Sequence, residues 1–378
     1  MKIAIAIDLD WPYEHHYDVV RGILNYGKEN DWECVIEPWL ETADSIDHVP
    51  GNYDGVIGRV TPQLYDWCTK NDVPLVNVWT NSPVNNVPST LIDVKAIGKV
   101  AADYLISRGF QNFGFLADLD DSSSNDMLEG FTERLYRKNL DCEVVWVKRP
   151  VSKEEWEVHD NTYANWTPDL HLPIAVFSSD HLLSRYFCEW CKKNDLLVPD
   201  DVAILSGLSN ELICDRIEPA LSNIKNKFTD LGYEAADLLR DLALGEVYRG
   251  PRLISPGELI ERRSTDVEPV QDRIIARALR FIWDFSSGPI QVGDVARALD
   301  INRRSLERRF RQVLNSTVNE EILRSRISRA KKILTHSNKT VKEVAERSGF
   351  TSSQRLAQVF REQLGMSAKE FREHSRAS

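Results

Sequence analysis

Four arginines near residue 305 have a spacing that could bind nucleic acid. Arg304, Arg308 and Arg311 fall at positions i, i+4 and i+7, and Arg303 precedes them, so a helix would bring them to one face. A guanidinium group can donate two hydrogen bonds to guanine O6 and N7, which makes Arg304 and Arg308 the candidates for base contact. The alternatives are contact with phosphates and a basic face that is merely solvated.

The elements that would position these arginines favour DNA. Residues 293–299 form a short apolar-periodic segment and a turn follows at 300–302, while Leu306, Phe310 and Val313 are expected to face a core behind the arginines. A recognition helix that lies in the major groove requires this order of short helix, turn and second helix. The sequence therefore predicts a helix-turn-helix motif, at about 291–314.

The same order of elements recurs near the C-terminus, at about 341–364. Residues 341–348, a turn at 349–350 and a helix at 352–364 would form a second helix-turn-helix. Its outward face has fewer charges and more amides, which predicts weaker readout. The residues predicted to contact DNA in the two motifs are Arg303, Arg304, Ser305, Arg308, Arg311, Ser352, Ser353, Gln354, Arg355 and Gln358.

A continuous amphipathic helix, about 317–336, is expected to join the two motifs. At ~1.5 Å per residue it is roughly 30 Å long, close to the ~34 Å between major grooves on one face of B-DNA, so one chain could occupy adjacent grooves. The side chains expected largely outward on this helix are Arg324, Arg326, Arg329, Lys331 and Lys332. Helix starts are marked by capping boxes, which are expected at Thr317 with Glu320, Thr340 with Glu343, Thr351 with Gln354, and Ser367 with Glu370.

The distribution of charge divides the chain into two halves. The 378 residues include 47 Lys and Arg against 58 Asp and Glu, and the length predicts two or three domains. From residue 270 onward there are 22 basic and 12 acidic residues, a net charge of +10, which leaves 25 basic and 46 acidic residues before it, a net charge of −21. A basic segment of this kind indicates a nucleic-acid partner. The predicted organisation is a ligand-sensing domain at 1–264, a linker at 265–271 and a DNA-binding domain at 272–376.

The acidic half alternates short apolar runs with amphipathic stretches, which predicts parallel sheets covered by helices on both faces. More than ten such elements exceed one small sheet, so two α/β lobes are expected. Strands are expected at 2–7, 32–37, 55–60, 74–79, 113–117, 144–147, 174–178 and 202–205, and helices at 17–28, 95–108, 124–138, 181–194 and 230–244.

Ligands of open α/β sheets bind beyond the carboxyl ends of the strands, so the loops at those ends are the candidate site. Carboxylates, amides and an arginine offer the paired hydrogen bonds that sugar hydroxyls require, and a tryptophan can stack on the apolar face of a ring. For each residue the alternative is a helix cap or simple packing. The predicted effector-binding residues are Asp10, Trp11, Tyr13, His16, Arg59, Trp79, Asp118, Asn125, Asp180, Ser209 and Asn210, and Asp8 and His15 lie in the same loops.

The last hundred residues resemble the DNA-binding domain of the AraC/XylS family of transcription regulators. The stretches that carry this resemblance are Asp294-Val-Ala-Arg-Ala-Leu299, Leu306-Glu-Arg-Arg-Phe310, Arg329-Ala-Lys-Lys-Ile-Leu334 and Val344-Ala-Glu-Arg-Ser-Gly-Phe350. The first half resembles the type I periplasmic-binding-protein fold of LacI-type sensors, through Tyr53-Asp-Gly-Val-Ile57, Pro219-Ala-Leu-Ser222 and Leu231-Gly-Tyr-Glu-Ala-Ala236.

This combination is similar to that of bacterial xylose-operon regulators. The resemblance implies a homodimeric, ligand-responsive transcription regulator that binds a double-stranded DNA operator and a sugar, and that contacts RNA polymerase if it is an activator. Met127 and Ser209 stand where LacI-type sensors usually have an arginine and an aspartate, so the effector could differ from xylose. Leu356-Ala-Gln358 replaces a common Phe-Ser-Arg, which removes a phosphate-contacting arginine.

Other functional classes find less support in the sequence. It has no Gly-x-Gly-x-x-Gly, Walker A or Gly-x-Ser-x-Gly motif, and His15-His16 lacks a partner at ligand spacing, so no catalysis, cofactor or metal is expected. Cys188 and Cys191 are expected to be core thiols. An apolar run at the start and no stretch of ~18 apolar residues predict a cytoplasmic protein without membrane contact. The rival to a regulator is a DNA-bending architectural protein with a degenerate sensor, whose DNA affinity no small molecule would change.

Overall fold

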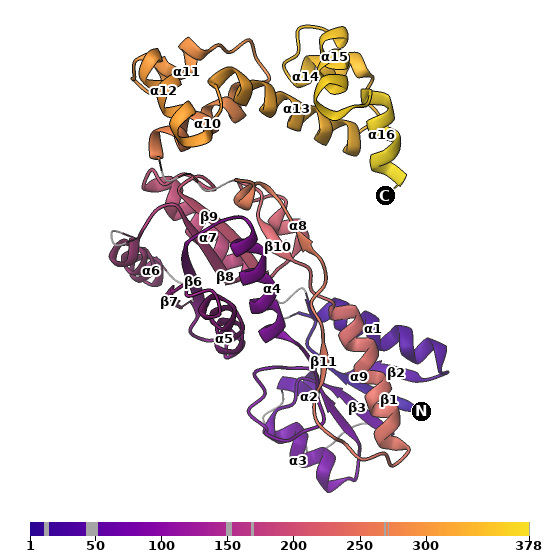
Figure 1. Cartoon of the computed structure of the whole chain (residues 1–378). Helices are drawn as coiled ribbons and strands as arrows, with labels where there is room; N and C mark the ends of the chain where they lie inside the picture. The colour runs from indigo at the N-terminus through magenta and orange to yellow at the C-terminus, as the bar shows by residue number, and fades with distance from the viewer. Residues whose placement is uncertain are drawn as a thin grey trace. The chain divides into compact units, whose positions relative to one another are not determined.

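A computed structural model gives the structure of this chain and describes residues 1–10, 15–42, 52–148, 153–167, 170–267, 270 and 272–377. The chain divides into two compact units, residues 1–268 and 269–378, each of which is described by itself (Figure 1). Among these residues the first unit has sheets with covering helices, parallel except for one antiparallel edge strand, and the second has helices alone. The predicted class, a two-lobed α/β sensor followed by an all-α domain with two helix-turn-helix motifs, is confirmed.

The first lobe of the sensor is built on a parallel sheet whose described strands have the order β2-β1-β3-β4. These strands are β1 (Lys2–Ala6), β2 (Glu33–Ile36), β3 (Gly55–Gly58) and β4 (Leu75–Asn77), and the helices around them are α1 (His15–Glu29), α2 (Trp39–Thr42), α3 (Pro62–Lys70) and α9 (Phe228–Ala243). Alternate residues of β1 enter different cores, because Ile3 and Ile5 join the cluster that contains α1 and α9, whereas Ala4 and Ala6 join the one that contains Leu64 of α3. Figure 1 shows α1 and α9 side by side in this lobe.

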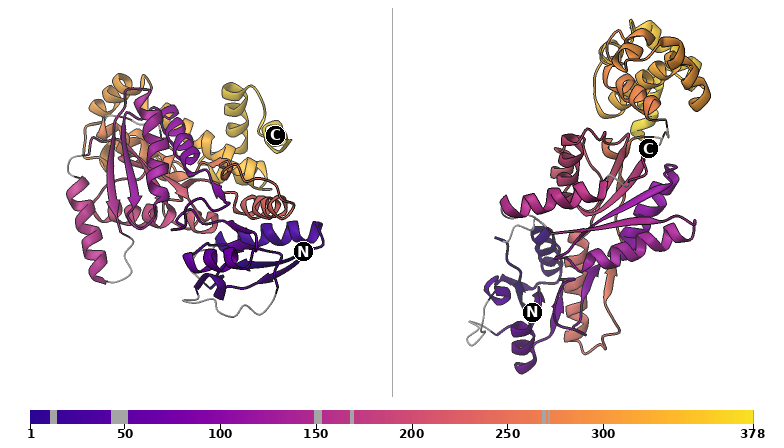
Figure 2. Two further views of the ribbon diagram at one scale, coloured as in Figure 1. Left: turned by 90° about the horizontal axis from the view of Figure 1, so that it is seen from below. Right: turned by 90° about the vertical axis from the view of Figure 1, so that its left-hand side faces the viewer.

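The second lobe has a larger sheet, with the described strands in the order β12-β10-β9-β8-β6-β7. The strands are β6 (Asn112–Asp118), β7 (Cys142–Val147), β8 (Ile174–Asp180), β9 (Val202–Leu208), β10 (Ser222–Ile224) and β12 (Leu259–Ile260), and the helices are α4 (Val94–Ser107), α5 (Ser123–Tyr136), α6 (Lys153–Trp166), α7 (His181–Lys193) and α8 (Glu211–Cys214). Helices cover both faces of this sheet (Figure 2). Phe177 of β8 packs with Phe131 of α5, whereas Val176 packs with Phe187 of α7. Cys188 and Cys191 of α7 are free thiols in the second of these cores, as predicted.

The described chain crosses between the lobes at three places. The crossings follow β5 (Thr90–Ile92), β10 and β11 (Arg252–Ile254). Backbone hydrogen bonds tie them together, from Asp93 N to Ile254 O at 2.9 Å and from Gly257 N to Lys225 O at 2.8 Å. β5, β10, β11 and β12 are absent from the sequence prediction. They have only two or three residues each and, unlike the equally short β4, do not lie within a longer apolar run such as 74–79. The three crossings form the hinge of the sensor.

Glycines let two pairs of helices cross with their backbones in contact. On Gly232 of α9, a Cβ would lie 2.8 Å from the carbonyl carbon of Val19, and on Gly22 of α1 it would lie 2.7 Å from the nitrogen of Tyr233. Gly98 of α4 and Gly130 of α5 form the equivalent crossing in the second lobe. Any other residue at these positions would have to push the helices apart.

The second unit consists, in its described part, of seven helices around two cores. They are α10 (Arg273–Phe285), α11 (Val292–Ala298), α12 (Arg303–Leu314), α13 (Val318–His336), α14 (Val341–Arg347), α15 (Ser353–Leu364) and α16 (Ala368–Ala377). The first core contains Leu306 and Phe310 of α12, and the second contains Leu356 and Phe360 of α15. Helix α13 contributes its first half to one core and its second half to the other.

Local capping chemistry sets most of the helix starts in this unit. The capping boxes of Thr317 with Glu320 and of Thr340 with Glu343 are confirmed, as are the reciprocal hydrogen bonds of Ser367 with Glu370. The predicted box of Thr351 with Gln354 is wrong by one residue. The N-cap is Ser352, whose Oγ accepts from Arg355 N at 3.1 Å, because the turn before α15 extends one residue further.

Three other expectations are corrected by the packing. Val313 does not face the core and is 43% exposed, because α12 ends at Leu314 and the latter side chain packs there instead. Arg326 and Arg329 do not point outward but donate to backbone carbonyls at the C-terminal end of α10. Thr265 belongs to the sensor rather than to the linker, because its buried hydroxyl bonds to Ser222 Oγ at 2.6 Å.

Candidate functional site

Helix α12 presents the predicted basic reading face. Arg304, Arg308 and Arg311 are exposed, and within the described structure none of them forms an ion pair. Arg303 is also exposed but pairs with Glu307 at 3.0 Å, which partly neutralises it. Ser305 is half-buried beside them. The face therefore offers three unpaired guanidinium groups along one side of a rigid helix.

On helix α15, the side chains of the predicted reading face form hydrogen bonds with one another and with Glu362. Ser352, which caps the helix, and Ser353 are half-buried and Gln354 is exposed, while Arg355 donates to Gln358 Oε1 at 2.9 Å. Gln358 in turn donates to Glu362 Oε1 at 2.7 Å, so an acid is part of the chain of hydrogen bonds. DNA binding would have to break or reorient these bonds, which supports the predicted inequality between the two reading helices.

The spacer between the reading helices has the predicted length. Helix α13 contains 19 residues, which corresponds to roughly 28 Å at ~1.5 Å per residue. Its N-cap follows α12 directly, and its C-terminal end leads into α14. The unit therefore consists of two helix-turn-helix motifs, each with its own core, joined by one helix.

In the first lobe, the predicted effector residues cluster beyond the ends of β1, β3 and β4. Arg59 pairs with buried Glu41 and lies 4.3 Å above the ring centre of Trp79. His16 Nδ1 lies 2.6 Å from the carbonyl oxygen of Asp8. Burial raises the pKa of Glu41 and lowers that of His16, so the low polarity of this region favours neutral forms, although the Arg59 charge opposes this at Glu41.

Asp10 is the other predicted residue of this loop that the structure describes. Asp10 is exposed, with its N–H bonded to Asp8 Oδ1 at 2.9 Å. Trp11 and Tyr13 lie outside the described residues. The guanidinium of Arg59 interacts with Glu41 and Trp79, so its charge is already paired within the first lobe.

In the second lobe, the predicted residues differ in exposure and in the hydrogen bonds that they make. Asp180 is 5% exposed and caps α7, accepting from Leu182 N at 2.6 Å and Leu183 N at 3.0 Å, the alternative role considered from the sequence. Asp118 is buried at the end of β6 and accepts from Asp120 N at 3.0 Å, while Asn125 is exposed on α5.

Two hydrogen bonds join the loop after β4 of the first lobe to the segment between β6 and α5 of the second. Asn81, in the loop after β4, donates to Asp121 Oδ1 at 3.0 Å and accepts from Ser122 Oγ. Asp121 and Ser122 lie between β6 and α5 of the second lobe. These two bonds form a latch between the lobes. No local sequence signal at Asn81 predicted it.

Ser209 and Asn210 line a cavity of about 660 Å³ against the hinge, together with His15 of the first lobe. Asn210 caps α8, accepting from Leu212 N at 2.9 Å. The Ser209 hydroxyl donates to Ile224 O at 3.3 Å and accepts from Asn223 Nδ2 at 2.6 Å. The remaining wall comes from the crossings themselves, including Lys225, Asn226, Phe228 and Glu258.

Asn226 is the most informative residue of this cavity. Both its Oδ1 and its Nδ2 are buried and make no hydrogen bond with any described residue. Leaving a buried polar group unsatisfied costs ~1–3 kcal/mol, so such groups usually mark a site that a ligand or water completes. Next to it, the rings of His15 and Phe228 stack with centres 4.1 Å apart. The sequence analysis missed Asn226 because it follows the three-residue strand β10.

Charges around this cavity are mixed and partly paired. Lys225 Nζ lies 3.7 Å from Glu211 Oε1, and Asp18, Asp230 and Glu258 also line the wall. Met127, in the position where LacI-type sensors usually have an arginine, is completely buried against Phe177 and Gly207. That part of the second lobe is therefore apolar and closed, and the polar groups lie nearer the hinge.

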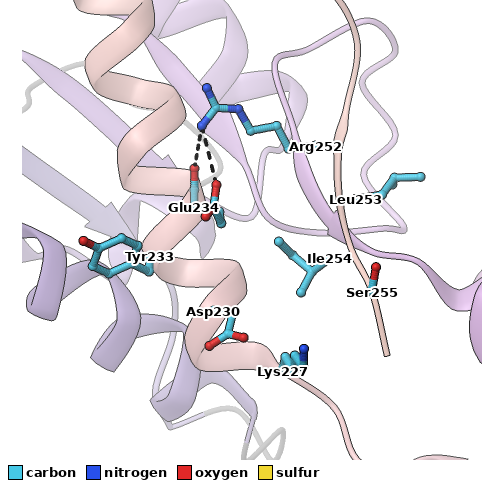
Figure 3. Close-up of a pocket in the computed structure, with 8 residues that line it drawn as sticks. All are labelled: Lys227, Asp230, Tyr233, Glu234, Arg252, Leu253, Ile254 and Ser255. Carbon is cyan, nitrogen blue, oxygen red and sulfur yellow. Dashed lines mark hydrogen bonds and ion pairs between the residues drawn. The ribbon is translucent and has the colours of Figure 1, made fainter. Parts of the chain in front are cut away.

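A second cavity, of about 650 Å³, lies on the first lobe between α9 and β11 (Figure 3). Figure 3 shows Arg252 turned toward Glu234, and Arg252 also bonds to Asp237 at 2.8 Å and to Asp241. The only arginine among its described lining residues is thus paired with three carboxylates of the same lobe. This cavity shares Lys227 and Asp230 with the hinge cavity, but none of its lining residues comes from α4 to α8 of the second lobe, so a ligand there would make fewer contacts between the lobes.

The described part of the chain holds no candidate metal site and no candidate membrane span. No group of three or more His, Cys, Asp or Glu residues there could hold a metal ion. No described helix is both long and apolar enough to cross a membrane.

Comparisons with known proteins agree with this two-part organisation. Residues 102–265 match the periplasmic binding protein-like domain and residues 295–374 match a helix-turn-helix domain family. The chain is 26% identical to the xylose operon regulatory protein of Haemophilus influenzae, over 98% of each chain. It is also 26% identical to that of Escherichia coli K12, over 98% of this chain and 97% of the relative.

Solved structures give the same picture of the fold. A xylose-binding transcription activator aligns with a TM-score of 0.75 and 23% identity, over 98% of this chain and 97% of that one. A cellobiose complex of the regulator CelR aligns with a TM-score of 0.56 and 19% identity, over 70% of this chain and 84% of that one. The first similarity covers both units, whereas the second covers a length close to that of the sensor.

Proposed function

We propose that this chain, a transcription regulator in which a periplasmic-binding-protein-like sensor precedes a helix-turn-helix DNA-binding domain, responds to a small sugar bound in the hinge cavity. The observation that carries the proposal is Asn226, whose amide is buried without a hydrogen-bond partner in the wall of that cavity. The xylose-operon relatives span both units of this chain, so D-xylose is the first candidate.

The cavity suits a neutral sugar better than a charged ligand. An amide can accept from one hydroxyl and donate to its neighbour, which matches a vicinal diol. Asn210 and Ser209 add polar groups beside it, and the edges of the stacked His15 and Phe228 rings offer an apolar surface for ring carbons. The lining contains four carboxylates and two lysines, an acidic excess that disfavours an anionic ligand such as a uronate.

The position of the cavity links ligand to movement. Its wall includes His15 of the first lobe, Asn210 of the second lobe and two of the three hinge crossings. A sugar that contacts all of them binds the closed arrangement more tightly than the open one, and shifts the equilibrium by that difference in affinity. The Asn81 bonds to Asp121 and Ser122 would stabilise the same closed state.

The response would reach DNA through the arrangement of reading helices. We assign base and phosphate contacts chiefly to Arg303, Arg304, Arg308 and Arg311 of α12, with Ser352, Gln354, Arg355 and Gln358 of α15 as the weaker set. Ser305 and Ser353, near the starts of the two helices, would contact the sugar-phosphate backbone of the DNA. We further propose a cytoplasmic homodimer that contacts RNA polymerase if it activates.

Titration calorimetry of the full chain with D-xylose, L-arabinose, D-glucose and D-glucuronate tests the sugar response. We expect heat with at least one neutral sugar, and a DNA affinity that changes when that sugar is present. Heat with none of the four, together with unchanged DNA binding, would favour the architectural protein with a degenerate sensor.

Substitution of Asn226 makes the test specific. Because the Asn226 amide has no partner without ligand, Asn226→Leu should leave the free protein as stable as the wild type or more so, yet abolish the heat of sugar binding. Asn319→Ala, an exposed asparagine of α13, is the control and should change neither. Sugar binding that survives in Asn226→Leu would place the effector elsewhere.

A further inference from the structure

Three segments of the DNA-binding unit meet at one arginine. Arg326, in the middle of α13, donates from Nε to Ser286 O and from Nη2 to Gly288 O, both at 2.9 Å. Gly349 lies in the turn of the second helix-turn-helix, and a Cβ there would be 2.9 Å from Arg326 Nε and closer still to Ser286 O. We call Arg326, Ser286, Gly288 and Gly349 the junction.

The first half of the junction is explained by the end of α10. The last carbonyls of a helix have no partner within it, and arginines from elsewhere can supply donors. Ser286 is the C-cap of α10, and Arg329 provides a further donor to Trp283 O. Ser286 and Ser325 are buried with their hydroxyls 2.8 Å apart. Helix α10 is thereby fixed to the centre of α13.

The second half of the junction depends on a glycine. Gly349 has φ +80, a left-handed conformation that ends α14 and that other residues adopt only with strain. Its missing side chain is also what allows the turn of the second motif to touch the Ser286 carbonyl at the end of α10, a helix that packs in the first core. The same position therefore serves both the local turn and the contact between the second motif and the helix that carries the first core.

Helix α13 by itself would not hold the two motifs in a fixed relation. Val318 and Ile322 belong to the first core, Ala330 and Leu334 to the second, and Arg326 lies between them. A helix can bend or twist between two bodies that are attached only to its ends. A contact to the side of the helix axis removes that freedom.

We propose that the junction makes Arg326 a positioning residue, which fixes the separation and pitch of α12 and α15. The protein then selects operators by the spacing between two half-sites as well as by their sequence. Arg326 acts on DNA through this geometry and makes no DNA contact, in contrast to Arg304 and Arg308 of α12. The inference rests on the proposed reading roles of α12 and α15 but is independent of the sugar.

The probe is the duplex that the full-length wild type selects from a random library, with one or two base pairs then inserted between the two protected segments. One inserted base pair moves the second half-site by ~3.4 Å and turns it by roughly 34°. We expect the wild type to lose affinity by about tenfold or more, as for a mismatched site. Arg326→Met should bind the selected duplex less tightly and lose less than about threefold on insertion.

Arg326→Lys, which keeps one donor group, should restore part of the spacing penalty. Arg324→Met is the matched control, because Arg324 lies on the same helix with a side chain that is 70% exposed and should leave the penalty unchanged. An Arg326→Met protein with the wild-type penalty overturns the proposal. The proposal is also overturned if Arg326→Met loses as much affinity for a duplex with a single half-site as for the selected duplex, since Arg326 would then be a DNA contact. A wild type that tolerates insertion also overturns it, without bearing on sugar binding.

A measurement without DNA provides the second test. Spin labels on genetically encoded ketone-bearing residues at Gln312 and Glu362, both exposed, would report the distance between α12 and α15 without using the cysteines. We expect a broader distance distribution in Arg326→Met than in the wild type or Arg324→Met. If Arg326→Met fails to fold, Gly349→Ala, whose Cβ must open the junction, decides by the same two readouts. A distribution as narrow as in the wild type refutes the proposal.

Discussion

Replacing Gly232 by alanine should destabilise the sensor and weaken its ligand binding. A Cβ at this position would lie 2.8 Å from the carbonyl carbon of Val19 and closer still to its oxygen, where ordinary contact begins at 3.4 Å. Helices α1 and α9 must therefore separate by more than the roughly 0.6 Å that the carbon alone requires. Overpacking of this kind costs ~1–3 kcal/mol, and a helix carbonyl cannot rotate away, which favours the upper end. The better helix propensity of alanine returns up to ~1 kcal/mol, so the net loss is about 2 kcal/mol.

Scanning calorimetry of the full chain would measure this loss. We expect the melting transition of the sensor to fall by roughly 4–8 °C. Gly293→Ala is the control, because Gly293 lies in α11 and nothing is within 4 Å of the added Cβ. That substitution should stabilise the DNA-binding unit by about 0.5–1 kcal/mol and leave the sensor transition unchanged, which also identifies the two transitions.

The ligand assay separates packing from function. His15 at the start of α1 stacks on Phe228 at the start of α9, so a shift between these helices must disturb the hinge cavity. Gly232→Ala should therefore bind the effector sugar less tightly than the wild type, whereas Gly293→Ala should not. A Gly232→Ala protein that melts as the wild type does would show that the helices separate at no cost, and would refute the reasoning from the close crossing.

Three further predictions follow from single residues. Arg308→Ala should reduce the preference for operator over random DNA by ~1–3 kcal/mol, and Gln358→Ala by less; equal losses in a binding titration would contradict the inequality of the reading helices. Asn81→Ala removes the two bonds to Asp121 and Ser122 across the lobes and should weaken sugar affinity by about 5-fold or more, since each net hydrogen bond contributes ~0.5–1.5 kcal/mol; unchanged calorimetric affinity would argue against a latch. Burial lowers the pKa of His16 from its ordinary value of 6.5, so the unfolded chain binds the proton more readily and stability falls as the pH drops below about 6.5; His16→Gln should flatten this slope in melting experiments at pH 7.5 and 5.5, and an unaltered slope would assign it to other groups.

Local patterns predicted the DNA-binding unit well. The capping boxes at Thr317 and Thr340 involve residues three apart, so the hydrogen bonds that begin α13 and α14 can be predicted from a short stretch of sequence. Ser352 shows the limit of this approach, since adjacent hydroxyls offer two caps and only the path of the turn chooses between them. In the sensor the longer strands were predicted for the same reason, whereas β10 has three residues and no period to detect.

The candidate site was harder to predict because its contacts are long-range. Asp180 has the residue type and place of a ligand but caps a helix, and Asn226 has no motif yet lies unsatisfied in the wall of a cavity. The sequence by itself determined the two-part organisation, the helix-turn-helix pair and the basic face of α12, because periodicity, caps and charge are properties of adjacent residues. Only the tertiary structure decided that Arg304 faces solvent while Arg326 is bound to Ser286, 40 residues away, because an arginine's role depends on which groups folding brings within hydrogen-bond distance.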